Sequence, residues 1–432
     1  MNRTFASHLL WSYCGLATMA VGGLLANILV ARLMAPDALG VFNQIYAALI
    51  IASQIAVGGI HHSALKHIAE LTGAGGQLRR AVASSALMLG LLSGGASALV
   101  FAVLARPIGT LLDSPEVGRG ILWAAPGLWL FAVNKIALSL LNGLSRFRAL
   151  SLLQSLRVLV LLAAIAIIAW RAVPPAIFGA AFTAAELVTA ICAFVALGHL
   201  VVPTRGAELR ELVRRHLSFG VRGFLGGLLL EAHLRIDILL LGVFASDRVV
   251  GLYSLAAVIA EGLYSVLHVL RTVINPTLVT MIRDSRVAEI QALVARVQRV
   301  VYPLAAAATI CIGVLAPIAF GWMTDSDAYD DAATALTILA AGLAVYSGLL
   351  PFDSILLQAG RPGLHTTFIA TQLVTNVTLN LALIPLAGIF GAAGATAASF
   401  TLSGLYLALF VRRALGFPLT SIKPLTQHRG TA

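Results

Sequence analysis

The sequence has little charge. Asp, Glu, Lys and Arg make up 11% of its 432 residues, whereas apolar residues make up 59%. A water-soluble domain usually carries about 25% charged residues, so this chain has too few to solvate a surface of its size. The mean hydropathy of +0.94 agrees. A soluble globular fold is therefore excluded, and the lipid bilayer is the solvent that suits the chain.

Several signatures of catalysis are also missing. The three cysteines, Cys14, Cys192 and Cys311, lie in separate apolar runs, with neither metal-ligand spacing nor a disulfide pattern. The sequence contains no Gly-rich phosphate loop followed by Lys-Ser or Lys-Thr, which argues against an ATPase. The predicted outer loops are too short for the usual active site of a polytopic glycan polymerase or glycosyltransferase. We therefore expect no enzyme activity, no cofactor and no metal site.

Apolar runs of about 20 residues, each long enough to cross a bilayer, recur along the chain. They predict an all-α, polytopic membrane protein with about twelve transmembrane helices. The first run is too long for a cleavable signal, so we expect it to be retained as a helix. The helices are expected at residues 9–31, 41–60, 81–104, 121–142, 150–170, 176–198, 217–243, 250–275, 299–321, 333–356, 364–386 and 392–411.

The formal net charge of +11 has an uneven distribution. Five of the 29 Lys and Arg residues fall inside predicted helices and five in predicted outer loops, and the remaining 19 share one side with the N-terminus. This is the positive-inside asymmetry of membrane proteins. It predicts a multi-pass protein with both termini in the cytoplasm, and it accounts for the excess charge without nucleic acid as a partner.

The chain repeats itself. Residues 177–181, IFGAA, recur at 389–393, an offset of 212, and Gly40 aligns with Gly251 at an offset of 211. This period spans an even number of helices, so the two halves should share one orientation, as in transporters with parallel repeats. The sequence therefore predicts a six-helix half at 1–200, a cytoplasmic linker at 201–216 and a second half at 217–432, with a cavity where the halves meet.

Charged side chains inside the predicted helices are costly in lipid and so are expected to face the protein interior. Residues 250–275 show this best, because Glu261, His268, Arg271 and Asn275 fall on one helical face. We interpret this face as a hydrated cavity wall, with a helix-packing seam as the alternative. Guanidinium groups such as that of Arg271 match phosphate oxygens. Acidic residues in helices are candidates for a coupling cation: Glu186, Glu261 and Asp237.

Three segments resemble a known family. Residues 29–70, with Arg32 ahead of the turn at 35–40, are similar to the opening of polysaccharide and O-antigen flippases. Residues 141–147, LNGLSRF, resemble that family's loop after its fourth helix, and residues 235–253 resemble the start of its second half. The family belongs to an exporter superfamily that also holds multidrug extruders and the lipid II flippase.

The resemblance implies a V-shaped transporter of the bacterial inner membrane, working by alternating access in cell-surface polysaccharide synthesis. Its substrate would be a polyprenyl-diphosphate-linked oligosaccharide, and its other partners membrane lipid, a coupling cation (proton or sodium) and further polysaccharide-assembly membrane proteins. A cation-coupled drug or small-solute antiporter of the same superfamily is the alternative. The candidate substrate-binding residues are Arg32, Lys135, Arg157, Arg222, Arg271, His268 and Asn275.

Overall fold

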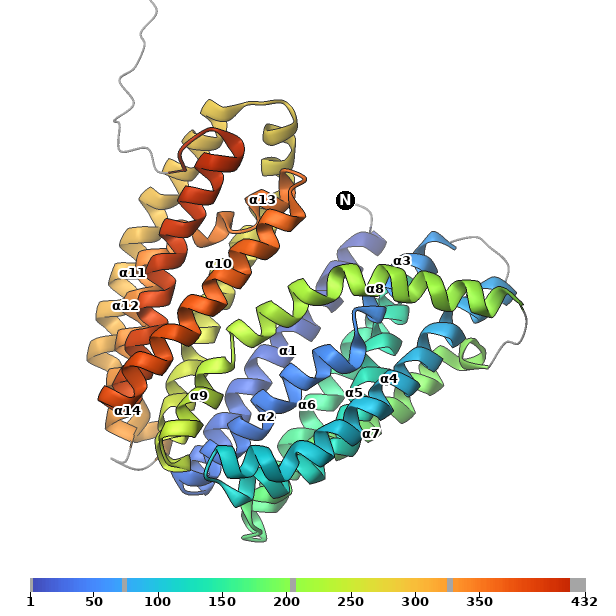
Figure 1. Ribbon diagram of the computed structural model, residues 1–432, viewed down its shortest axis with the longest axis horizontal. Coiled ribbons are helices and arrows are strands. Elements are labelled where there is room, and N and C mark those ends of the chain that lie inside the picture. Colours follow the sequence, from blue (N-terminus) through green and yellow to red (C-terminus); the bar gives the residue numbers. More distant parts are fainter. Residues whose placement is uncertain (1–2, 72–75, 203–206, 325–328, 420–432) are drawn as a thin grey trace, which may run out of the picture. The chain divides into compact units, whose positions relative to one another are not determined.

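The computed structural model describes residues 3–71, 76–202, 207–324 and 329–419. Within these ranges the fold is entirely helical (Figure 1). The α-helices are α1 (Arg3–Leu33), α2 (Pro36–Val57), α3 (Ile60–Glu70), α4 (Gly76–Leu111), α5 (Pro115–Gly143), α6 (Phe147–Trp170), α7 (Phe178–Leu197), α8 (Ala207–His233), α9 (Ile236–Phe244), α10 (Asp247–Arg283), α11 (Val287–Thr324), α12 (Asp330–Ser347), α13 (Ile355–Gln358) and α14 (Pro362–Leu415). Short 3-10 helices lie at Pro175–Ile177, Gly198–Val201 and Leu350–Phe352.

The described part of the chain contains eight helices that are long and apolar enough to cross a membrane. A ninth span is reached if α12 and the bent segment Leu350–Gln358, which turn by 53°, count as one. The apolar part of α1 is shorter and covers Ala17–Leu33. The expected class, an all-α multi-pass membrane protein, is confirmed.

Several of the predicted helices differ from the observed ones. The segment expected as one helix at 217–243 is broken between α8 and α9, where Arg235 has φ −136° and ψ −8°. The segments expected at 364–386 and 392–411 both lie in α14, with a non-helical Gly388 (φ 52°) between them. A positive φ is a conformation that glycine adopts without a steric penalty, so the chain bends there.

The helices are distributed over two compact units. Unit 1 comprises Met1–Val258 and Phe320–Ala332, and unit 2 comprises Ile259–Ala319 and Ala333–Ala432. The boundaries run through α10, α11 and α12 and so do not coincide with the repeat boundary expected at 201–216. The two units are therefore not the two repeats, and the division into repeats stays a prediction.

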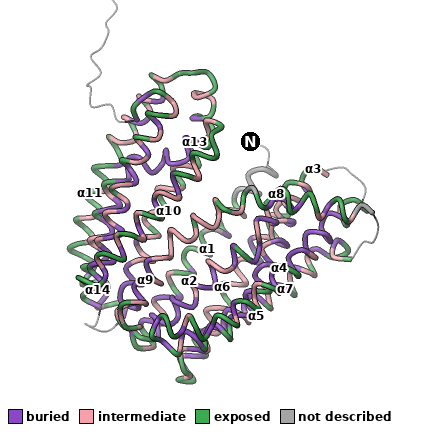
Figure 2. Tube along the Cα trace, in the orientation of Figure 1, coloured by how far each residue is buried: buried purple, intermediate pink, exposed green. Residues whose placement is uncertain are grey.

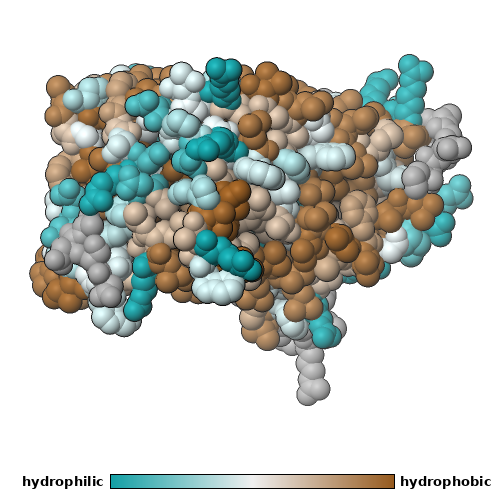
Figure 3. All heavy atoms as spheres, turned by 90° about the horizontal axis from the view of Figure 1, so that it is seen from below, coloured by the Kyte–Doolittle hydropathy of each residue, from teal (hydrophilic) through white to brown (hydrophobic). Residues whose placement is uncertain are grey.

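Burial separates interior helices from those that face lipid. In α2, 78% of the most apolar window is buried inside the protein, against 17% in α6 and 11% in α11 (Figure 2). Hydrophobic residues also cover much of the face seen in Figure 3, with hydrophilic residues gathered in smaller patches. Exposed apolar surface on this scale would be unfavourable in water and is favourable in a bilayer.

Helix α2 and the first part of α10, both in unit 1, cross through two glycines. A Cβ atom on Gly40 would collide with the backbone carbonyl of Asp247, and a Cβ on Gly251 would collide with that of Pro36. The offset of 211 relates the two contacts to each other, because it aligns Gly40 with Gly251 and Pro36 with Asp247. The crossing is therefore reciprocal. The Asp247 carboxylate also accepts hydrogen bonds from Gln44 (2.6 Å) and Ser114 (2.7 Å).

The first part of α8, which includes most of the segment expected as a linker, is docked on α3 and α4. Leu212 is buried in the same apolar cluster as Ile60 and Ala81. One turn later His216 is fully buried, with its Nδ1 2.9 Å from the Ser63 hydroxyl. Burial, and then the nearby His67, lowers the pKa of His216 to about 4. This segment is a packed helix and not an unstructured connection.

Candidate functional site

Two of the predicted basic residues, Lys135 on α5 and Arg157 on α6, meet around one aromatic ring. The Arg157 guanidinium lies 5.4 Å and the Lys135 ammonium 5.9 Å from the centre of Phe131. Phe131 precedes Lys135 by one helical turn, so α5 presents both side chains on one face. Cation–π contacts of this kind hold charged groups in a poorly hydrated place.

Both cations also have polar partners. Arg157 pairs with Glu186 of α7 at 3.2 Å, and the Glu186 carboxylate also accepts a hydrogen bond from Asn134 at 2.7 Å. The Glu186 side chain is only 7% exposed, so this pair is largely desolvated. Lys135 donates to the uncharged Gln54 of α2 at 3.1 Å. We call these residues, Gln54, Phe131, Asn134, Lys135, Arg157 and Glu186, the α5–α6 cluster.

The polar face expected along residues 250–275 is present on α10 and supplies a second group of residues, in unit 2. Arg271 donates to Asp353 at 2.8 Å and contacts the His268 ring. One turn further on, Asn275 accepts a hydrogen bond from Ser354 at 3.0 Å. Three aromatic rings of this unit stack in a row, with Phe400 between Tyr264 and Tyr346. We call Arg271, His268, Asn275 and Asp353 the α10 cluster.

The other predicted site residues lie elsewhere. Arg32 is exposed in the last turn of α1. The side chain of Arg222 lies outside the described residues. Asp237, at the start of α9, accepts hydrogen bonds from Tyr253 (2.5 Å) and from the backbone N–H of Ile238 (2.9 Å). Glu261 lies in α10, partly exposed. The structure therefore gathers Lys135, Arg157 and Glu186 in one place and Arg271, His268 and Asn275 in another.

Some of these partners have no direct signal in the sequence. Asp353 was recognisable as a carboxylate inside a helix, but nothing in its position linked it to Arg271, which lies 82 residues earlier. Asn134 and Phe131 are uncharged, so a search for charged side chains inside helices does not identify them. The available signal was their spacing, because both lie within one turn of Lys135 on α5.

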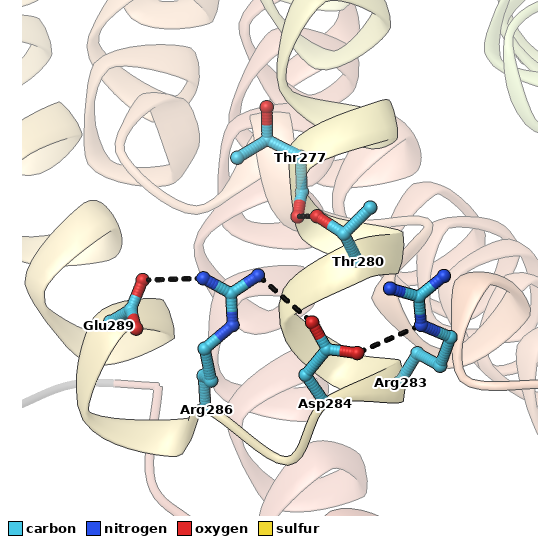
Figure 4. A network of polar contacts seen from close by, with 6 residues as sticks. All are labelled: Thr277, Thr280, Arg283, Asp284, Arg286 and Glu289. Atoms are coloured by element: carbon cyan, nitrogen blue, oxygen red, sulfur yellow. Dashed lines mark hydrogen bonds and ion pairs between the residues drawn. The ribbon is translucent and has the colours of Figure 1, made fainter.

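A third set of charges, at the turn between α10 and α11, has a different character. Arg286 donates to Asp284 and Glu289, each at 3.1 Å, and Arg283 donates to Asp284 at 2.8 Å (Figure 4). These side chains are 38–73% exposed. The hydrogen bond from Arg283 lowers the pKa of Asp284 below its usual value. This is a solvated surface network, and we assign no ligand to it.

Metal ligands are not gathered in the part of the chain that the structure describes. No group of three or more His, Cys, Asp or Glu side chains there lies close enough together to hold an ion. The clusters offer guanidinium, ammonium, imidazole and amide groups instead, which suit an anionic or sugar-bearing ligand.

Comparison with known protein families identifies the family of this chain. The sequence profile of the family described as "Polysaccharide biosynthesis protein" matches residues 10–282, well over half of the chain. The chain belongs to this family. No curated protein sequence matches it significantly. The resemblance inferred from residues 29–70 and from the later segments is confirmed.

Solved structures with similar folds agree with the family. One, a "Lipid II flippase MurJ, inward closed conformation", has a TM-score of 0.76 at 14% identity, covering 94% of this chain and 87% of that one. An inward-facing MATE family multidrug resistance transporter of the MOP superfamily has a TM-score of 0.72 at 15% identity, covering 94% and 98%. A MATE transporter of Vibrio cholerae gives 0.63 at 16% identity, covering 96% and 97%.

These matches show that the chain has the fold of the MOP superfamily structures. It is a multi-pass membrane protein of a polysaccharide biosynthesis family. At these identities the likeness extends to the fold alone and carries no residue roles across.

Proposed function

We propose that this protein moves a polyprenyl-diphosphate-linked oligosaccharide across the bacterial inner membrane by alternating access, in cell-surface polysaccharide synthesis. Two findings support the proposal: membership of a polysaccharide biosynthesis family, and a fold that resembles that of a lipid II flippase. Flipping needs a site that tolerates a charged headgroup within a membrane protein whose outer surface is apolar. The α5–α6 cluster meets this need, and it is the observation that carries the proposal.

The proposal includes the topology expected from the sequence. The chain crosses the membrane twelve times, with α1, the broken pair α8–α9 and the two parts of α14 on either side of Gly388 adding to the clearly apolar spans. Residues 1–200 and 217–432 form two parallel halves of a V-shaped exporter, with both termini in the cytoplasm. The positive-inside distribution of Lys and Arg supports this orientation.

Lys135 is the strongest candidate for a contact with the diphosphate. An ammonium has three N–H donors, and the bond to Gln54 uses one of them with a neutral acceptor. Arg157 is already paired with Glu186. Among the residues that the structure describes, no carboxylate lies within 4.0 Å of the Lys135 ammonium. A diphosphate that enters the cluster therefore gains a charge-assisted bond from Lys135 without displacing a directly paired carboxylate. Arg157 then adds a second positive charge near the same aromatic ring.

Arg271 forms an ion pair with Asp353 in the second half of the chain, as Arg157 does with Glu186 in the first half. A phosphate that replaces Asp353 as the partner of Arg271 would release a carboxylate, which could then take up a proton. This exchange offers a route for coupling to a cation, with Glu186, Glu261 and Asp237 as further candidates. His268 and Asn275, adjacent to Arg271 on α10, are proposed to contact the glycan.

The test is transfer of a fluorescent polyprenyl-diphosphate oligosaccharide across proteoliposomes. The variant is Lys135→Gln, and the charge-matched control is Arg283→Gln in the exposed network. We expect loss of at least about tenfold in the initial transfer rate for Lys135→Gln, because one charge-assisted bond contributes about 1.5–3 kcal/mol. The control should transfer at the wild-type rate.

Wild-type transfer that is unchanged in Lys135→Gln would refute the site while leaving flipping in place. A wild-type protein that transfers no lipid-linked glycan, but exchanges a cationic drug for protons or sodium, would refute the flippase and establish the antiporter alternative.

A further inference from the structure

A pocket outside both clusters opens at the turn between α5 and α6, in unit 1. Its volume is about 620 Å³, and its walls include Trp11 of α1, Arg146 of the turn, and Arg148 and Leu152 of α6. None of its lining residues belongs to the α5–α6 cluster. Three of them, Ser145, Arg146 and Phe147, belong to the segment LNGLSRF, which the proposed transport mechanism leaves without a role.

The backbone of this turn fixes both arginines at the pocket. Ser145 has a positive φ of 58°, and the N–H of Arg146 closes the turn on the carbonyl of Leu141 at 2.9 Å. Arg146 is then the residue that precedes the first turn of α6, and Arg148 lies in that turn. The chain reversal therefore brings two positive charges to one end of α6 in a defined arrangement.

The two guanidinium groups are held by uncharged partners. Arg146 donates to the backbone carbonyl of Ala196 at 2.7 Å, and Arg148 stands over the Trp11 ring at 5.7 Å. Among the residues that the structure describes, no carboxylate lies within 4.0 Å of either group. Each guanidinium carries five N–H donors, so most of them are available to an anion. The chemistry of the pocket selects a phosphate or another compact oxyanion.

An exposed apolar stripe leads away from the pocket along α6. It begins at Leu152, which also lines the pocket, and continues through Leu159, Ile167 and Trp170, which are 51%, 61%, 58% and 78% exposed. Steps of seven, eight and three residues keep these side chains on one face of a helix. The stripe is about 27 Å long at 1.5 Å per residue. It is therefore long enough to lie beside lipid acyl chains.

We infer that this pocket binds the phosphodiester headgroup of an anionic membrane phospholipid, with its acyl chains along the exposed stripe of α6. A free phosphate could use the arginines but would gain nothing from the stripe. In the topology proposed above, the pocket faces the cytoplasmic leaflet, and basic pockets at that surface bind anionic headgroups. Trp11 at the pocket and Trp170 at the far end of the stripe have the positions that interfacial tryptophans favour.

Native mass spectrometry of the purified full-length protein tests this inference. The protein is mixed in detergent with phosphatidylglycerol or phosphatidylcholine, and the lipid that stays bound is counted. The variants are the double substitution Arg146→Ala with Arg148→Ala, and the single substitution Arg148→Glu. The single variant keeps the Arg146 hydrogen bond to Ala196 and so addresses charge without disturbing the turn. The charge-matched control replaces Arg412 and Arg413, both exposed at the end of α14, by alanine.

The wild type and the control should retain phosphatidylglycerol in preference to phosphatidylcholine. Both pocket variants should bind phosphatidylglycerol at least about tenfold more weakly, given about 1.5–3 kcal/mol for a hydrogen bond to a charged group. Equal retention by the pocket variants and the control would overturn the inference. Displacement of the lipid by excess glycerol phosphate or inorganic phosphate would overturn the assignment to a lipid, because those ions lack acyl chains. None of these results depends on flipping, so the two proposals can fail separately.

Discussion

Arg157 of α6 and Glu186 of α7 form a 3.2 Å ion pair in which the carboxylate is almost entirely removed from solvent. Both residues are sequence candidates, one for substrate and one for a coupling ion, and the structure makes each the partner of the other. Neither can change its charge without affecting its neighbour. This relationship supports a set of predictions about stability that are independent of transport.

Replacing one member of this pair should destabilise the protein strongly. Arg157→Leu or Glu186→Leu leaves an uncompensated charge in a desolvated place, at a cost of about 3–5 kcal/mol. The double variant should lose much less than the sum of the two, because two apolar side chains of similar size need no partner. Thermal or denaturant unfolding in detergent measures all three. Additive losses would show that the two side chains act independently.

The exposed network at the α10–α11 turn should behave in the opposite way. Asp284→Asn removes two ion pairs, with Arg283 and Arg286, yet all three side chains are at least 38% exposed. Solvated pairs of this kind contribute little to stability, and less at high salt. We expect the unfolding midpoint of this variant to stay close to that of the wild type in high salt. A loss as large as that of Glu186→Leu would contradict this account of the network.

The reciprocal crossing of α2 and α10 should resist even one added methyl group. In Gly40→Ala or Gly251→Ala the new Cβ meets backbone of the opposite helix, which cannot rotate away. Overpacking of this kind costs about 1–3 kcal/mol, and the two variants should lose similar amounts. Gly262→Ala, in the same α10 but with no described atom within 4 Å of the new Cβ, is the control. It should be neutral or gain up to about 1 kcal/mol from helix propensity. If unfolding measurements show Gly262→Ala to be less stable than both Gly40→Ala and Gly251→Ala, the close crossing is refuted.

His216 should make the stability of the protein depend on pH in mildly acidic solution. Its pKa falls from 6.5 to about 4 in the folded protein, since burial and then His67 disfavour its charged form. The unfolded chain therefore takes up a proton first as the pH decreases. The stabilisation is complete above about pH 6.5 and is lost as the pH falls towards about 4, by roughly 3 kcal/mol in all.

His216→Gln should remove this component, so that its unfolding free energy changes less than that of the wild type between these pH values. His199→Gln, at an exposed histidine in the same connection, should keep the wild-type pH profile. Identical profiles for the wild type and His216→Gln would show that His216 is not the group responsible.

Much of the fold could be predicted because long apolar runs have few alternatives in a bilayer. The helices expected at 41–60, 121–142 and 150–170 overlap α2, α5 and α6. The errors occur where local backbone conformation decides the outcome. Nothing in the hydropathy of residues 217–243 indicates the break at Arg235, because a break depends on how that residue packs against its neighbours.

The candidate site was predictable only in part, and for a different reason. Periodicity brought Arg271, His268 and Asn275 to one face of α10, since residues three or four apart in a helix must be neighbours. Contacts between helices have no such rule. The partnership of Arg157 with Glu186, like that of Arg271 with Asp353, depends on packing that spacing does not encode.

The crossing of α2 and α10 has a consequence beyond stability. Gly40 contacts Asp247, and Gly251 contacts Pro36. At the offset of 211, Gly251 corresponds to Gly40 and Asp247 to Pro36, so each glycine contacts the counterpart of the residue four positions before it. This is the self-complementary contact that a two-fold homodimer makes between identical surfaces. Two half-length chains could form it with a single set of residues. In this protein the two sides of the contact lie within one polypeptide and so need not be identical. Asp247 accepts hydrogen bonds from Gln44 and Ser114, whereas Pro36, at an offset of 211, has no polar side chain.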